Sequence, residues 1–278
     1  MNAFGLEFID LPGAWPDSEG PVRASVRWRL DDHGFTPSPR WWFRDLDDGL
    51  IVHFEDVAEY HLRRGSAADV SVTLGPATEF GAALAFLVSV IPLGLPLFEL
   101  EPFHGAALET ADGSALLVLG PAEAGKSTTA SALRASGLRF LADDACALDD
   151  GGRLWPGPPL FGIHELGPSD VEFAAYDDKS IVAVIDHDPS PREVWGAVIL
   201  QPERRAALAV APIPRREAVT AVLGQVRAPR VMPSLRDERQ FRMAVALAAR
   251  PLAMVSFDKD RHGPEHVARA IVGWLEAA

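Results

Sequence analysis

The chain has 278 residues, of which 48 % are hydrophobic, which is enough for a core in one large domain or two modest ones and excludes a disordered chain. Asp and Glu outnumber Lys and Arg by 39 to 26, a net charge of −13, so neither a nucleic acid nor an anionic membrane is expected as the main partner. The single cysteine, Cys146, excludes an intramolecular disulfide and a multi-cysteine metal site.

Residues 1–75 are predicted to form a small, mostly antiparallel β lobe. Runs that alternate or are rich in β-branched residues occur at 22–30, 50–54 and 70–74, with turn-forming residues between them. Aromatic residues are frequent here, including Trp15, Trp28, Trp41 and Trp42. Nothing in this region is typical of a catalytic cluster.

The segment from Phe80 to Phe98 contains no charged residue and approaches the length of a membrane span. Pro92 and Pro96 interrupt it, so the sequence predicts a buried core helix over 79–91 followed by an extended connector. The N-terminal residues lack the basic start and apolar core of a signal peptide. We therefore expect a soluble cytoplasmic protein.

The segment from Gly120 to Ser127 fits the phosphate-binding pattern G-x-x-x-x-G-K-[ST] at every fixed position. An apolar run at 115–119 predicts a strand before it, and residues 128–136 predict a helix after it. Loop amides and a helix N-terminus then favour negative charge at one point. The residues expected to bind a nucleoside triphosphate are Gly120, Pro121, Ala122, Glu123, Ala124, Gly125, Lys126, Ser127 and Thr128. Lys126 would reach the β- and γ-phosphates, and the Ser127 hydroxyl would bind Mg²⁺.

The remaining elements predict a mixed sheet with helices. A hairpin is expected from 102–109 to 115–119, further strands at 138–148, 194–200, 206–211 and 252–257, and helices at 216–226, 237–249 and 264–277. This order differs from a run of βαβ units, so a doubly wound parallel sheet is not expected. Residues 76–278 are predicted to form one domain around the phosphate-binding loop.

Two adjacent carboxylates, Asp143 and Asp144, follow an apolar strand-like run. One could lie beside Mg²⁺ while the other accepts a proton from an attacking hydroxyl. The alternative is that Asp-Asp opens a turn, which the resumption of the apolar run after Asp144 disfavours. His104 precedes the loop by one hairpin. A lone histidine is more often structural than catalytic, but the strand that follows it must lie beside the strand of the loop.

Taken in order, these motifs resemble the C-terminal catalytic domain of the HPr kinase/phosphorylase family, from about residue 98 to 168. The resemblance is closer to the family's shorter kinase-like relatives, including those encoded with ribosomally made peptides such as lasso peptides. It implies a fold related to phosphoenolpyruvate carboxykinase and phosphate transfer from ATP to a serine of a peptide or small protein. It assigns proton acceptance to Asp143 and an active-site role to His104, and it implies a possible homo-oligomer.

The chain departs from that family in the segment 161–167, where Gly162 takes the position of the metal-binding glutamate. Either Glu165 replaces that glutamate, or Asp144 holds the metal with water. Lys179 resembles a lysine of the relatives and either stabilises the transferred phosphate or forms a surface ion pair. Two other functions stay open: a nucleotide-binding module without catalysis, and a kinase of a small metabolite, which a metabolite-sized pocket would favour.

Overall fold

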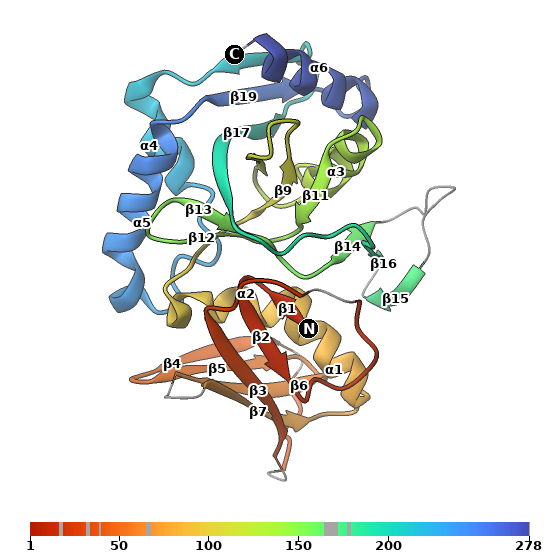
Figure 1. The fold of residues 1–278 in the computed structure, drawn as a ribbon, viewed down its shortest axis with the longest axis vertical. Coiled ribbons are helices and arrows are strands. Elements are labelled where there is room, and N and C mark those ends of the chain that lie inside the picture. The colour runs from red at the N-terminus through yellow and green to blue at the C-terminus, as the bar shows by residue number, and fades with distance from the viewer. Residues whose placement is uncertain are drawn as a thin grey trace.

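The structure is a computed structural model that describes residues 1–16, 19–31, 34–38, 40–64, 68–163, 172–176 and 179–277. The N-terminal sheet lies at one end of the molecule, and the sheet that carries the loop 120–125 lies at the other (Figure 1). The predicted mixed α/β architecture is confirmed, because parallel and antiparallel pairings occur within the same sheets.

The N-terminal sheet has the strand order β1-β2-β3-β7-β6-β5-β4 among the described residues. Its strands are β1 (Asn2–Ala3), β2 (Leu6–Ile9), β3 (Ala24–Leu30), β4 (Trp42–Leu46), β5 (Gly49–Phe54), β6 (Ala58–Arg63) and β7 (Ala68–Leu74). The expectation of an antiparallel lobe is correct for β4 to β7 and for β1 with β2, whereas β3 is parallel to both β2 and β7. The reason is that the β4–β6 meander separates β3 from β7 in sequence, so that they run in the same direction.

One continuous helical segment packs on this sheet. It consists of α1 (Glu79–Ala85), a π-helical turn η1 (Phe86–Val90), α2 (Ile91–Gly94) and a 3₁₀ turn η2 (Leu95–Phe98). The expected extended connector is therefore wrong. Pro92 and Pro96 each lie at the start of a new short helix, where the missing N–H is not needed.

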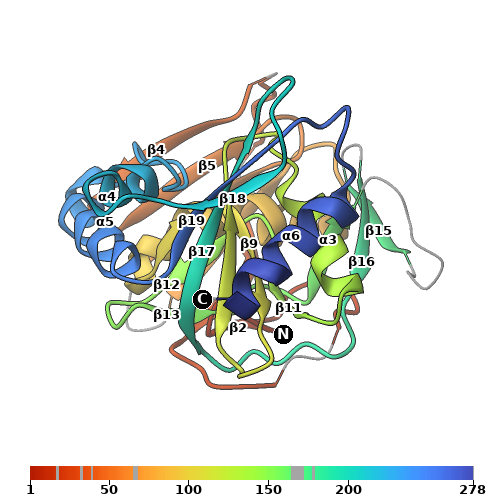
Figure 2. The same cartoon turned by 90° about the horizontal axis from the view of Figure 1, so that it is seen from above.

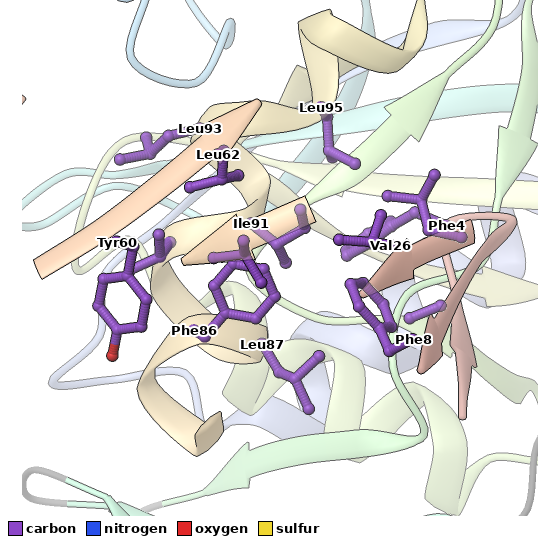
Figure 3. Close-up of a cluster of buried hydrophobic side chains, with 14 of the residues drawn as sticks. Phe4, Phe8, Val26, Tyr60, Leu62, Phe86, Leu87, Ile91, Leu93 and Leu95 are labelled. Carbon is purple, nitrogen blue, oxygen red and sulfur yellow. The ribbon is translucent and has the colours of Figure 1, made fainter. Parts of the chain in front are cut away.

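The helical segment supplies the core of the N-terminal end of the molecule. Figure 3 shows Phe86, Leu87 and Ile91 packed against Tyr60 and Val26 of the sheet. The segment is long and apolar enough to cross a membrane by composition, but 78 % of its most apolar window is buried inside the protein. This burial is what a core helix shows.

The second sheet has the order β11-β9-β10-β17-β13-β12-β8, with β19 beside β17 and β18 beside β19. Its strands are β8 (Glu101–Phe103), β9 (Gly105–Glu109), β10 (Ala115–Leu119), β11 (Arg139–Ala142), β12 (Cys146–Leu148), β13 (Arg153–Trp155), β17 (Arg192–Pro202), β18 (Ala209–Pro212) and β19 (Leu252–Phe257). A further small sheet contains β14 (Leu160–Ile163), β15 (Glu172–Tyr176) and β16 (Lys179–Ala183).

Helices cover both faces of the second sheet. Seen from above, α3 (Lys126–Ala135) and α6 (Pro264–Ala277) lie on one side, and α4 (Arg215–Leu223) and α5 (Pro233–Ala248) on the other (Figure 2). Each pair closes a separate apolar core, one containing Leu133 and Ile271 and the other containing Val222 and Leu247. The central strands are buried on both faces for this reason, which explains their nearly continuous apolar sequences.

The strand predicted over 138–148 is broken at the two carboxylates. β11 pairs with β9, whereas β12 pairs with β8 and β13. Asp144 has a φ of +65°, in the left-handed region that interrupts a strand and that Asp tolerates better than most residues. His104 lies at the matching break between β8 and β9. The turn at Asp143 and Asp144, which the surrounding apolar residues disfavoured, is therefore present. It places Asp144 and His104 outside the regular strand pairing.

Candidate active site

The loop 120–125, which carries the G-x-x-x-x-G-K-[ST] motif, joins the end of β10 to the start of α3, as the motif predicts. Gly120 and Gly125 have φ values of +153° and +94°, which L side chains rarely adopt. Among the described residues, no side chain caps the N-terminus of α3. The first amides of a helix have no partner within the helix, so this N-terminus is available to an anion.

Three parallel strands end at the same edge of the sheet as the loop. β10, β17 and β19 run parallel and in register, so their carboxyl ends lie together. Ligands bind at such an edge in open α/β sheets. The turn after β19 adds Lys259, whose amino group donates to the carbonyl oxygen of Glu123 in the loop. Lys259 could not be predicted from the sequence, because nothing in its local sequence marks it.

Lys126 lies inside the loop. Its side chain is 8 % exposed, and its Nζ donates to the Pro121 carbonyl oxygen at 2.7 Å. Burial lowers the pKa of the Lys126 amine to about 8, although the carboxylates of Asp144 and Asp143 partly oppose this shift. The loop thus holds a cation at the point where the motif expects phosphate oxygens.

Asp143 connects the loop to the neighbouring elements. The Ser127 hydroxyl donates to Asp143 Oδ1 at 2.9 Å, and the Gly162 amide of β14 donates to Oδ2 at 3.3 Å. Burial and the adjacent Asp144 raise the pKa of the Asp143 carboxyl, against the opposing effect of the Ser127 hydrogen bond. A carboxyl with a raised pKa binds a proton more readily than an ordinary aspartate.

Asp144 has a different environment, although it is the next residue. Arg227 Nη2 lies 2.7 Å from Asp144 Oδ2, and His104 Nε2 lies 3.5 Å from Oδ1. Burial opposes ionisation of Asp144, but Arg227 and His104 outweigh it and hold the pKa of this carboxyl below its usual range. The two adjacent carboxylates therefore differ, because the pKa of Asp143 is raised and the pKa of Asp144 is lowered.

Arg227 is held in place by a buried ion pair. The side chains of Arg236 on α5 and Glu101 on β8 are both 0 % exposed, with Nη2 of Arg236 2.6 Å from Oε1 of Glu101. Arg236 Nη2 also donates to the Arg227 carbonyl oxygen at 2.8 Å, and the Arg227 amide donates to Pro102 at 2.9 Å. Arg227 and this pair could not be predicted from the sequence. Arg227 lies between α4 and α5 without any motif, and the pair joins two elements 135 residues apart.

A cavity of about 200 Å³ opens beside the two carboxylates. Lys179 of β16 lines it together with Asp143, Asp144 and Gly162. A Cβ atom at Gly162 would lie 3.4 Å from Lys179 Cδ and 3.7 Å from Asp143 Oδ2, so the lack of a side chain keeps this corner open. A larger cavity, of about 650 Å³, lies at the other end of β10, between the β9–β10 turn and α6, and contains none of the predicted site residues.

The structure brings most of the predicted site residues together. Those that meet around the loop and the cavity are His104, Lys126, Ser127, Asp143, Asp144 and Lys179. Glu165 lies outside the described residues. Within the described part of the chain, no group of three His, Cys, Asp or Glu side chains could hold a metal ion. Mg²⁺ usually takes one or two carboxylates plus phosphate oxygens, and the oxygen atoms of Ser127, Asp143 and Asp144 fit that use.

No protein-family model matches the chain, and no curated protein matches its sequence. Among solved structures, the chain is similar to the Hpr(Ser) kinase/phosphatase from Coxiella burnetii. The TM-score is 0.33 and the sequence identity is 13 %, over 64 % of this chain and 92 % of the other. This is a distant fold relationship, and it carries no statement about activity, substrate or cofactor.

Proposed function

We propose that the protein is an ATP- and Mg²⁺-dependent phosphotransferase that acts on a hydroxyl group, with a serine of a peptide or small protein as the leading acceptor. The observation that carries this proposal is the contact of Ser127 with Asp143. It joins a phosphate-binding loop to a pair of carboxylates that open onto a cavity. A site that only binds a nucleotide would not need a pair of carboxylates that open onto a cavity.

In this mechanism the loop amides and Lys126 bind the phosphates. Asp143 orients the acceptor hydroxyl and takes its proton, since it borders the cavity from which the hydroxyl would approach. Asp144 stays ionised beside Arg227. Ser127 and Asp144 would hold Mg²⁺, which would neutralise charge on the phosphates. Lys179 would stabilise the transferred group from the opposite wall.

A small hydroxyl compound is the second candidate acceptor. The observation that favours it is the size of the cavity, about 200 Å³, because pockets for drug-sized ligands start at about 300 Å³. The third candidate is a nucleotide-binding module without catalysis, and the experiment below distinguishes it from a phosphotransferase.

The test combines binding of a fluorescent ATP analogue with transfer of labelled phosphate from ATP to hydroxyl compounds and serine peptides, with and without Mg²⁺. We expect Lys126→Ala to abolish both, and Asp143→Asn to abolish transfer while the analogue still binds. Asp144→Asn should raise the Mg²⁺ concentration required for half-maximal transfer. Binding without transfer by the wild type would support the module, and unchanged transfer by Asp143→Asn would contradict the role of Asp143.

A further inference from the structure

The cavity beside the carboxylates is shared between the two ends of the molecule. Its polar wall consists of Asp143, Asp144 and Lys179 from the second half of the chain. The facing wall comes from the N-terminal end and is mostly apolar, with Leu87, Val88 and Pro92 of the helical segment beside one polar residue, Ser89. A molecule in this cavity would therefore contact the carboxylates with one side and the helical segment with the other.

The apolar wall is built from a rare backbone conformation. Leu87 and Val88 lie in η1, where the Ile91 amide bonds back to the Phe86 carbonyl five residues earlier. π-helical turns are uncommon and occur often at functional sites, because the additional residue shifts side chains out of the regular helix pattern. Phe86 stays in the core of the lobe (Figure 3), whereas Val88 is only partly buried and borders the cavity.

The N-terminal residues fix the third side of the cavity. Phe4, which also lines it, has a φ of +56°, and its amide donates to the Pro156 carbonyl oxygen at 2.6 Å. The aromatic ring is 1 % exposed. This contact ties the first strands of the chain to the segment before β14, so the apolar and polar walls are held at a fixed separation.

We propose that the helical segment 79–98 recognises the phosphate acceptor, and that the acceptor is a small hydroxyl group on a compact apolar body. The inference rests on the proposed function and deepens it. A cavity of about 200 Å³ holds the volume of about seven water molecules. Such a space takes a serine-sized side chain or a small free alcohol, with the hydroxyl toward Asp143 and the apolar part against Val88.

The test changes the size of the apolar wall in both directions. Val88→Phe fills part of the cavity, and Val88→Ala enlarges it. Val245 on α5 is 45 % exposed and away from the cavity, so Val245→Phe and Val245→Ala are matched controls. The acceptors are ethanol, 2-propanol and 2-methyl-1-propanol in one arm, and N-acetyl-serine methylamide and a serine pentapeptide in the other. Affinity for a fluorescent ATP analogue and the melting temperature report on the nucleotide site and on folding.

We expect Val88→Phe to lower the rate of phosphate transfer at least about tenfold, a typical effect of small volume changes in an apolar pocket, with unchanged affinity for the ATP analogue. Val88→Ala should shift the preference toward the larger acceptor within the group of acceptors, free compounds or serine peptides, that receives phosphate. Which group receives phosphate also shows whether the hydroxyl comes from a free compound or a peptide. Wild-type rates and preferences in both Val88 variants, or no transfer to any acceptor, would overturn the inference while nucleotide binding stands. If the wild type does not bind the ATP analogue, the proposed function itself is wrong.

Discussion

Arg227 binds both the side chain and the main chain of Asp144. Its Nη2 lies 2.7 Å from Asp144 Oδ2, and its Nη1 donates to the Asp144 carbonyl oxygen at 2.8 Å. The second contact supports the left-handed backbone that separates β11 from β12. One guanidinium therefore fixes the charge and the orientation of this carboxylate, which makes Arg227 a positioning residue for the site.

The first prediction concerns the removal of this guanidinium. Arg227→Gln should lower phosphate transfer by about 10- to 100-fold, because a hydrogen bond to a charged group contributes about 1.5–3 kcal/mol. Affinity for the ATP analogue should change little, since Arg227 is on the Asp144 side of the site. The Mg²⁺ concentration for half-maximal transfer should rise. Arg230→Gln is the control, an exposed arginine three residues away, and an equal loss in both variants would contradict the positioning role.

The second prediction separates binding from stability at Lys126. Lys126→Met keeps the length of the side chain and removes a cation that is 8 % exposed. Affinity for the ATP analogue should fall at least about tenfold, as expected for loss of a charged hydrogen-bond donor to phosphate. The free energy of unfolding without nucleotide should rise by about 1 kcal/mol, since functional sites trade stability for activity. Chemical unfolding and analogue titration measure the two effects.

Lys259→Met serves as the comparison for Lys126→Met. Lys259 is exposed and contacts the loop from outside, at the Glu123 carbonyl oxygen. Its replacement should change the affinity by less than about threefold and leave stability within about 0.5 kcal/mol. A reduced stability of Lys126→Met without nucleotide would show that Lys126 is a structural part of the loop.

Much of the second sheet could be predicted from the sequence, because its signals are local. The G-x-x-x-x-G-K-S motif fixes the end of β10 and the start of α3, and the ranges expected for β19 and α6 agree with the structure. The helical segment 79–98 was predicted less well. Its two prolines favoured an end of the helix, but burial in the core stabilises short helices that each begin near a proline.

The contacts around Asp144 could not be predicted, because they join residues far apart in sequence. Arg227 is 83 residues from Asp144, and Arg236 is 135 residues from Glu101. No periodicity or motif relates such pairs, and their geometry depends on how α5 packs on the end of β8. The Asp-Asp pair itself indicates the break at Asp143 and Asp144. The apolar residues on both sides instead favoured one continuous strand, whereas in the structure they belong to two strands, β11 and β12, with different partners.

The third prediction concerns the buried pair of Arg236 and Glu101. Arg236→Met should lower the free energy of unfolding by about 3–5 kcal/mol, because it leaves a buried carboxylate unpaired. Burial already raises the pKa of Glu101, and Arg236 opposes this shift. The double variant Glu101→Leu/Arg236→Met should recover only part of the stability. An apolar pair avoids the cost of burying charge, but the carbonyl oxygens bound by Arg236 lose their donor.

Recovery of stability should not restore transfer in this double variant. Arg236 also donates to the carbonyl oxygens of Arg227, Ala228 and Val231, and no apolar side chain replaces these contacts. Arg242→Met is the control on the same helix, because Arg242 is 48 % exposed. Full recovery of transfer in the double variant would show that the turn at Arg227 needs no support from Arg236.

The fourth prediction is a pH dependence that arises at Asp149. This carboxylate is 3 % exposed and accepts hydrogen bonds from Trp155 Nε1 at 2.9 Å, the Arg153 amide at 3.1 Å and the Gly151 amide at 3.0 Å. Burial alone would raise the pKa of Asp149, but the bonds from Trp155 and Arg153 outweigh it and lower the pKa below 3.8. The stabilisation is therefore fully present above about pH 5 and is lost as the pH falls through the folded-state pKa.

Asp149→Asn should lower the free energy of unfolding by about 2 kcal/mol at pH 7, because charged acceptors contribute about 1.5–3 kcal/mol each when buried. The difference from the wild type should shrink as the pH falls below about 5, because the wild-type carboxylate then also becomes protonated. Urea unfolding at several pH values measures this. Asp150→Asn, at a neighbouring side chain that is 54 % exposed, should change stability by less than about 0.5 kcal/mol at every pH. If Asp149→Asn lowers the free energy of unfolding by the same amount at pH 2 and pH 7, then shape and hydrogen bonding, and not ionisation, stabilise the turn between β12 and β13.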